Sequence, residues 1–222
     1  SATPMTLGST LQVISGEKNG KPEFTTFLME NDAEGFTQEP MNRKMMWRAS
    51  NTGRLTFENV RLPKENMLGA AGEGSHIMLS TLDGGRLSIA AMGLGCAQGA
   101  YEMALAYSQK REQFGKPVCK FQAVSFKLAD MAMKIEAARC LLYKACRIKD
   151  AGLPYGKEAA MAKLYCSEVA AEVCDNAVQV MGGHGLLKDC NMERFYRDHR
   201  ILQIGEGTSE ILRLVISRYI GC

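Results

Sequence analysis

A single carboxylate near the end of the chain has the setting of a catalytic base. Glu206 lies between Gly205 and Gly207, and the hydroxyl residues Thr208 and Ser209, which can cap a helix, follow directly. With no side chain on either neighbour, the backbone lets a substrate approach closely, as removal of a proton from carbon requires. The same features also suit a solvated acid near a helix N-terminus, and an isolated Glu is more often that.

Three other segments contain groups that could bind a ligand. Residues 111–116 (REQFGK) and 181–185 (MGGHG) each fit the end of a predicted helix, where glycine and basic residues are expected. The second segment follows no predicted strand and does not match G-x-G-x-x-G, which excludes a Rossmann site. Residues 83–86 (DGGR) differ, because two adjacent glycines within a long helix need a reason.

The composition is that of an ordinary soluble globular protein. Among 222 residues, 27 are basic and 24 acidic, and the net charge of +3 does not favour nucleic-acid binding. The uncharged run 87–101 is Gly-rich and too short to span a membrane. Three scattered histidines and the absence of any C-x-x-C pair argue against a metal site. We interpret the cysteines as reduced, buried small hydrophobes in a reducing compartment: Cys96, Cys119, Cys140, Cys146, Cys166, Cys174, Cys190 and Cys222.

The first seventy residues have the pattern of β-strands. The short runs 11–14 and 24–28 flank a polar, turn-forming segment at 16–22, which predicts a hairpin. Further strands are expected at 54–57 and around Val60. So few strands bury little by themselves, so this segment is expected to be part of a larger sheet.

After a glycine-rich joint at 69–74 the period becomes helical. A helix over 75–110 has a middle crowded with small residues, which suits close approach of another helix or a flat ligand. The next helix carries apolar residues at alternating spacings of three and four from Phe121 to Leu142. A third ends at Gly182, and a fourth runs from Thr208 to about Tyr219. We predict a mainly α fold: part of an antiparallel β domain (1–70) followed by a C-terminal four-helix bundle (71–222).

Taken together, six short motifs resemble the acyl-CoA dehydrogenase family in order and spacing. They are TLDGGR (81–86), KREQFGKP (110–117), FQA (121–123), QVMGGHG (179–185), YRD (196–198) and GEGTSEI (205–211). The resemblance covers essentially the whole chain, since residues 27–30 and 57–63 are similar to the later half of that family's middle β domain. Each motif alone is weak, but six in register are specific.

The resemblance implies a catalytic role for Glu206. It is similar to the base that takes the α-proton of an acyl-CoA thioester while a hydride leaves the β-carbon for flavin N5. Some members supply the base from the position that Gly85 occupies here, and many have Tyr where this chain has Gly205. The residues that resemble those lining the acyl-CoA are Asp83, Gly84, Gly85, Arg86 and Gly207.

The resemblance also implies FAD as cofactor. Arg111 is similar to the residue that contacts the pyrophosphate, a role that suits a planar guanidinium. In this family Arg111 and the loop beginning at Gln179 contact the FAD of a neighbouring subunit, so a homodimer or a dimer of dimers is expected. The residues similar to FAD ligands are Arg111, Phe114, Gln122, Gln179, Val180, Met181, Gly182, Gly183, Thr208, Ser209 and Glu210.

Family members also have an N-terminal helical domain and an earlier β segment, which do not precede Ser1 here. The alternatives are a fragment of a longer polypeptide and a reduced homologue. We expect the fragment, because the β segment starts within a domain, and we expect it by itself to hold FAD poorly and turn over little. The implied partner is an electron-transfer flavoprotein, in the cytoplasm of a bacterium or the mitochondrial matrix of a eukaryote. One alternative is an acyl-CoA oxidase, in which oxygen reaches the reduced flavin. A non-catalytic bundle for assembly or acyl-CoA binding is another, but it predicts loss of Glu206, Arg86 or Arg111, and all three are present.

Overall fold

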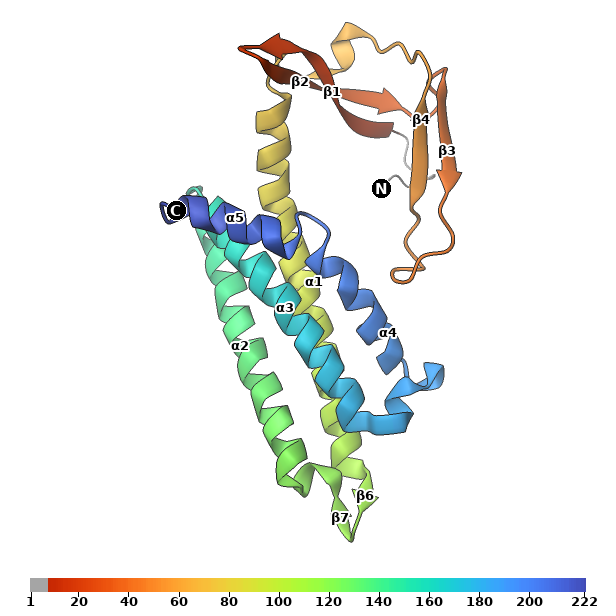
Figure 1. Cartoon of the computed structure of the whole chain (residues 1–222), viewed down its shortest axis with the longest axis vertical. Coiled ribbons are helices and arrows are strands. Elements are labelled where there is room, and N and C mark those ends of the chain that lie inside the picture. Colours follow the sequence, from red (N-terminus) through yellow and green to blue (C-terminus); the bar gives the residue numbers. More distant parts are fainter. Residues whose placement is uncertain (1–7) are drawn as a thin grey trace. The chain divides into compact units, whose positions relative to one another are not determined.

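The computed structural model describes residues 8–222. They fall into two units, one ending at Leu82 and the other running from Asp83 to Cys222, and the division lies within the first long helix (Figure 1). The prediction of a mainly α protein with an antiparallel β segment is confirmed.

The first unit contains two small antiparallel sheets. In one, β1 (Gly8–Lys18) pairs with β2 (Lys21–Glu30), and β2 also pairs with the short β5 (Met67–Leu68). The predicted hairpin is confirmed, but its strands reach further than expected and leave only Asn19 and Gly20 as the turn. Both residues have positive φ, 54° and 73°, as a two-residue hairpin turn with right-handed twist requires.

The second sheet joins β3 (Phe36–Pro40) to β4 (Gly53–Phe57), and β4 was predicted. The strand expected around Val60 is wrong: residues 58–63 form a bend and extended chain outside both sheets. Glu58 instead donates its backbone N–H to Gly35 O at 2.8 Å, which closes the end of the β3–β4 ladder.

The second unit is a helical bundle. It comprises most of α1 (Gly74–Lys110), together with α2 (Gln122–Asp150), α3 (Gly156–Met181) and α5 (Ser209–Tyr219). The segment before α5 is more helical than the sequence predicted, since it contains α4 (Met192–Asp198) and three short 3₁₀ turns. A small hairpin, β6 (Glu112–Gln113) with β7 (Lys116–Pro117), connects α1 to α2. Figure 1 shows this hairpin at one end of the bundle and α5 toward the other.

Small residues on α1 allow the close helix packing that the sequence predicted. A Cβ at Gly93 would lie 2.9 Å from the backbone oxygen of Cys166 on α3, and one at Gly99 would lie 3.0 Å from the ring of Phe195 on α4. On α2 the apolar stripe is confirmed from Leu128 to Leu142, where its members are buried. These seams hold α1, α2 and α3 side by side, so the residues of one helix keep a fixed position against the next.

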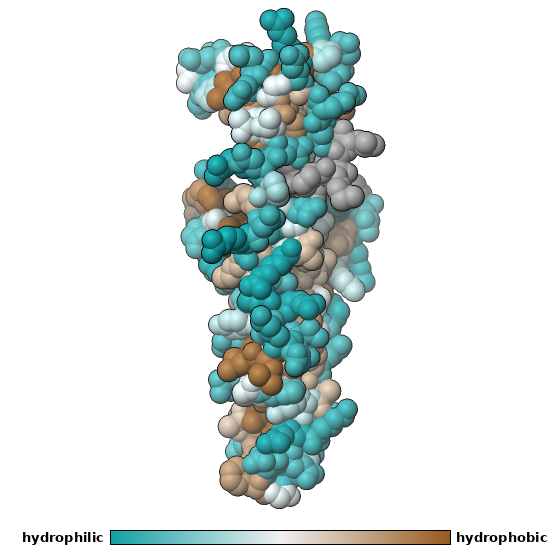
Figure 2. Space-filling view, turned by 90° about the vertical axis from the view of Figure 1, so that its right-hand side faces the viewer, coloured by the Kyte–Doolittle hydropathy of each residue, from teal (hydrophilic) through white to brown (hydrophobic). Residues whose placement is uncertain are grey.

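The cysteines are all free, but only Cys166 and Cys174 are buried, so the expectation that they are buried is wrong for the other six. Burial raises the pKa of the Cys166 thiol to about 12, as expected for an unreactive core residue. On the face shown in Figure 2, apolar residues lie in separate patches among hydrophilic ones. Of the helices within residues 8–222, none has both the length and the apolar content needed to cross a bilayer.

Candidate active site

Glu206 lies in a tight turn between the 3₁₀ turn His199–Gln203 and α5. Its φ is +56°, in the left-handed region that costs a non-glycine residue energy, and Gly207 follows with φ +101°. Left-handed conformations of this kind persist only where the surroundings hold them, and they gather at functional sites. The turn therefore presents Glu206 in a strained backbone conformation that the rest of the bundle must stabilise.

The Glu206 carboxylate lies directly against Gly85 of α1. A Cβ built on Gly85 would be 2.7 Å from Oε2 and 2.8 Å from Cδ of Glu206, closer than real Cβ contacts come. This contact supplies the reason for a glycine at position 85 of a long helix: any side chain there would displace the carboxylate.

Arg86 and Asp83 form an ion pair on α1 beside Gly85. Arg86 is buried, and its Nη1 donates to Asp83 Oδ1 at 2.7 Å. Its Nε is buried without a hydrogen-bond partner among the described residues, which leaves one donor of the guanidinium unused. Gly84 is less constrained. A Cβ added there would lie 3.9 Å from its nearest neighbour, the Tyr155 hydroxyl, which is an ordinary contact distance.

The first turn of α5 begins directly after the Glu206 turn. The Thr208 side chain caps the helix by accepting from the backbone N–H of Ile211 at 3.4 Å. Ser209 is buried, and its Oγ has no partner within residues 8–222. Glu210 is exposed, and its own backbone N–H, followed by the Thr208 hydroxyl, lowers the pKa of its carboxyl. Two buried polar atoms of this region, Arg86 Nε and Ser209 Oγ, thus remain available to a ligand.

Lys163 of α3 is a member of this cluster that the sequence analysis missed. It is fully buried, and its ammonium donates to the backbone oxygen of Gly207 at 2.6 Å. The signal was present in the sequence, because Lys163 lies one turn from Ala159 and Cys166 on a stripe of small apolar residues. A charged residue on a buried stripe requires a partner, and here the partner is the residue after Glu206.

The predicted FAD-binding residues fall into two groups, and the second lies around the β6–β7 hairpin. There a cavity of about 310 Å³ brings together the end of α1, the start of α2 and the end of α3. Arg111, Phe114, Val180, Met181 and Gly182 all line it. The described residues Gln122, Gln179 and Gly183 do not, but each is the immediate neighbour of one that does.

This cavity has features that fit a flavin nucleotide. Phe114 is 91% exposed, and its backbone is in the left-handed region with φ +51°. Arg111, which lines the same cavity, is also exposed. A Cβ at Gly182 or Gly183 would meet nothing within 4 Å, so the backbone there is open to a ligand. An exposed aromatic ring, a guanidinium and bare backbone are groups that bind a base and a pyrophosphate.

The two groups are far apart. Gly85 and Lys110 lie on the same helix, and their separation in sequence corresponds to roughly 40 Å along its axis. The Glu206 turn, which contacts Gly85, and the cavity at the end of α1 are therefore separate places on this chain.

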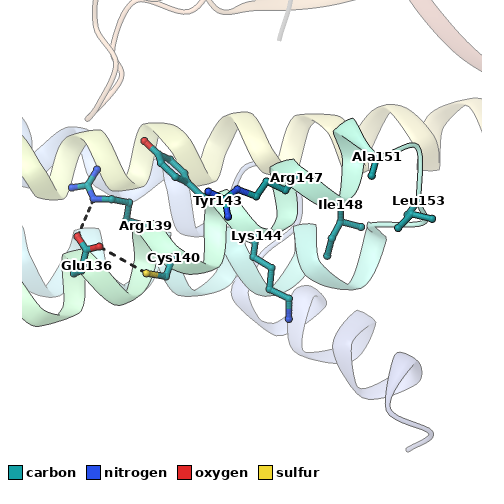
Figure 3. A pocket seen from close by; sticks show the side chains of 9 residues that line it. All are labelled: Glu136, Arg139, Cys140, Tyr143, Lys144, Arg147, Ile148, Ala151 and Leu153. Atoms are coloured by element: carbon teal, nitrogen blue, oxygen red, sulfur yellow. Dashed lines mark hydrogen bonds and ion pairs between the residues drawn. The ribbon is translucent and has the colours of Figure 1, made fainter.

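Another cavity, of about 470 Å³, lies along the second half of α2 and the turn that follows it, and contains none of the predicted site residues (Figure 3). In Figure 3 two side chains point to the Glu136 carboxylate. Arg139 Nε donates to Oε2 at 3.1 Å, and Cys140 Sγ donates to Oε1 at 3.8 Å. The residues that line this cavity are Glu136, Arg139, Cys140, Tyr143, Lys144, Arg147, Ile148, Ala151 and Leu153.

Comparison with known proteins gives consistent matches. The family model for the C-terminal domain of acyl-CoA dehydrogenases matches residues 72–221. A probable acyl-CoA dehydrogenase of Bacillus subtilis, YngJ, is 47% identical over 208 residues, 94% of this chain and 55% of the relative. Butyryl-CoA dehydrogenase from Megasphaera elsdenii superposes with a TM-score of 0.92 at 44% identity, over 95% of this chain and 55% of that one.

A chain of a solved structure described as the electron transferring flavoprotein of Acidaminococcus fermentans superposes with a TM-score of 0.87 at 47% identity. The match covers 89% of this chain and 52% of that one. This chain thus spans about half the length of the relatives it matches.

Proposed function

Because this chain belongs to the acyl-CoA dehydrogenase family, we propose that the protein carrying it removes hydrogen from the α,β bond of an acyl-CoA thioester. Glu206 is the base that takes the α-proton. The observation that carries the assignment is the strained turn: a carboxylate with φ +56°, held against Gly85, with unused buried polar atoms on Arg86 and Ser209 around it.

The local geometry suits proton abstraction from carbon. Gly205 and Gly207 place no side chain on either side of Glu206, and Gly85 leaves room for its carboxylate on α1. Position 85 offers no competing carboxylate. The α-proton of a thioester is weakly acidic, so the base must be held in one position while the carbonyl oxygen is polarised. In this proposal Asp83, Gly84, Arg86 and Gly207 form the wall of the acyl-CoA site.

FAD is the proposed cofactor, and when bound it would supply the two-electron acceptor for the β-hydride. Thr208, Ser209 and Glu210 would face it at the start of α5, where helix N–H groups favour oxygen ligands. Arg111, Phe114 and the segment 179–183 would hold FAD at the other end of the bundle. Because roughly 40 Å of helix separates these groups, we propose that each end serves a different FAD, so that two subunits complete one site in a dimer or dimer of dimers.

The similarity to a chain of the Acidaminococcus fermentans electron transferring flavoprotein structure supports an electron-transfer flavoprotein as partner. The similarity to butyryl-CoA dehydrogenase supports a short acyl chain, so butyryl-CoA is the first substrate to test.

The test is exchange of the α-proton. FAD-loaded protein carrying this chain is incubated with butyryl-CoA in deuterium oxide without oxygen, and deuterium at the α-carbon is measured by mass spectrometry. Glu206→Gln should lower the exchange rate by about 10²- to 10⁴-fold, the usual contribution of a general base, while flavin absorbance is retained. Glu168→Gln, a change to a carboxylate on α3 paired with Arg213, is the matched control and should exchange at the unsubstituted rate.

Exchange that persists in Glu206→Gln would exclude Glu206 as the base. Peroxide release in air, without reduction of an electron-transfer flavoprotein, would replace the dehydrogenase assignment by an oxidase.

A further inference from the structure

Lys163 occupies a position that the fold alone does not explain. Its side chain is fully buried on α3, among the alanines and cysteines that pack the bundle. A buried ammonium loses its hydration, and a lysine survives such burial only where it makes a strong interaction. The interaction here is the 2.6 Å hydrogen bond from Nζ to the backbone oxygen of Gly207.

That hydrogen bond reaches the turn that carries Glu206. Glu206 and Gly207 have φ of +56° and +101°, an arrangement that an isolated turn does not favour for glutamate. Charge-assisted hydrogen bonds are shorter and stronger than neutral ones, so an ammonium is well suited to holding a strained turn. α3 is in turn fixed against α1 by the close contact of Gly93 with Cys166, so the donor is held on a rigid element.

Charges from two other elements face Lys163. Arg86 of α1, itself paired with Asp83, opposes the charge of Lys163, and Glu206 of the turn favours it. Burial is the largest influence and, with Arg86, lowers the pKa of Lys163 to about 8. The ammonium form therefore predominates at neutral pH and is lost as the pH rises through about 8.

We propose that Lys163 is a positioning residue for the base: its ammonium holds the Glu206–Gly207 turn in the left-handed conformation and so keeps the Glu206 carboxylate against Gly85. The proposal rests on the proposed function of Glu206 and deepens it. In this proposal Lys163 acts through the backbone of the turn, by its hydrogen bond to Gly207, and does not contact the substrate.

The test compares two substitutions at Lys163. Lys163→Met keeps an unbranched chain of similar length and removes both charge and donor, and Lys163→Gln removes the charge but keeps a donor. In FAD-loaded protein, Lys163→Met should lower kcat and α-proton exchange by about 10- to 100-fold, as expected for a displaced base. KM for butyryl-CoA and FAD content should stay unchanged. Lys163→Gln should fall between Lys163→Met and the unsubstituted protein.

Two readouts separate positioning from a purely structural role. Exchange in the unsubstituted protein should fall as pH rises through about 8, and this dependence should be absent in Lys163→Met. Amide hydrogen exchange of the peptide 201–211 should accelerate in Lys163→Met, with α2 unchanged. Ser167→Ala, one turn along α3 and also fully buried, is the matched control and should change neither readout.

Unchanged kcat and unchanged amide exchange in both Lys163 variants would overturn the inference while leaving the function of Glu206 intact. If the unsubstituted protein shows no α-proton exchange, the proposed function falls first and the inference with it. If Lys163→Met does not fold, Lys163→Gln and the pH dependence of the unsubstituted protein decide the question.

Discussion

Gly85→Ala should separate activity from stability at this site. In a helix interior, alanine is favoured over glycine by about 1 kcal/mol. The new methyl group would lie 2.7 Å from Glu206 Oε2, where ordinary contact begins at about 3.4 Å, so the two must separate by roughly 0.7 Å. The carboxylate is the far end of a flexible side chain, so it can rotate away at little cost to the fold.

The base therefore moves and the protein remains folded. A misplacement near 1 Å can lower a rate by about 10²-fold, and we expect a loss of about 10- to 100-fold in α-proton exchange. The midpoint of thermal unfolding should stay the same or rise by a few degrees, the change that about 1 kcal/mol produces in a chain of this size.

The assay pairs α-proton exchange in deuterium oxide with thermal unfolding followed by circular dichroism. Gly95→Ala is the matched control, because it lies on the same helix and its Cβ would meet nothing within 4 Å. It should gain the same helix propensity and keep the unsubstituted rate. If Gly85→Ala also kept that rate, the contact between Glu206 and α1 would have no part in catalysis.

Two further predictions concern the cofactor and pH. Arg111→Gln should weaken FAD binding by about 10- to 100-fold, the loss expected for a hydrogen bond from a charged group. Fluorescence titration measures the affinity, with Arg147→Gln at an exposed position of α2 as the control. Equal FAD affinities of Arg111→Gln and the unsubstituted protein would contradict the proposed role of Arg111. Because Lys163 has a pKa of about 8 when folded and about 10.5 when unfolded, the unfolded chain binds more protons between these values, and stability rises with pH across that window. Relative to Lys163→Met, urea unfolding of the unsubstituted protein should show a gain approaching 3 kcal/mol from pH 8 to pH 10.5, and a flat difference would show that Lys163 titrates normally.

The sequence alone determined the elements whose signals are local and repeated. The stripe on α2 was visible because its residues recur at helical spacing over many turns. Short elements lack such repetition: α4 and β3 were not predicted, and the strand expected at Val60 does not form. The candidate base and the predicted ligand segments came from six motifs in register that resemble the acyl-CoA dehydrogenase family, since each motif by itself is a weak signal. Their roles stay predictions.

Only the tertiary structure decided how these residues meet. The contact of Glu206 with Gly85 and the hydrogen bond from Lys163 to Gly207 join the turn before α5 to helices far away in the sequence, and neither has a local signature. The same holds for the separation of the two proposed FAD-binding groups, one of which lies beside Gly85 and the other beyond Lys110 at the end of α1. Periodicity reports which face of a helix is buried, but it does not report which atoms of another helix that face will touch, since packing fixes those contacts.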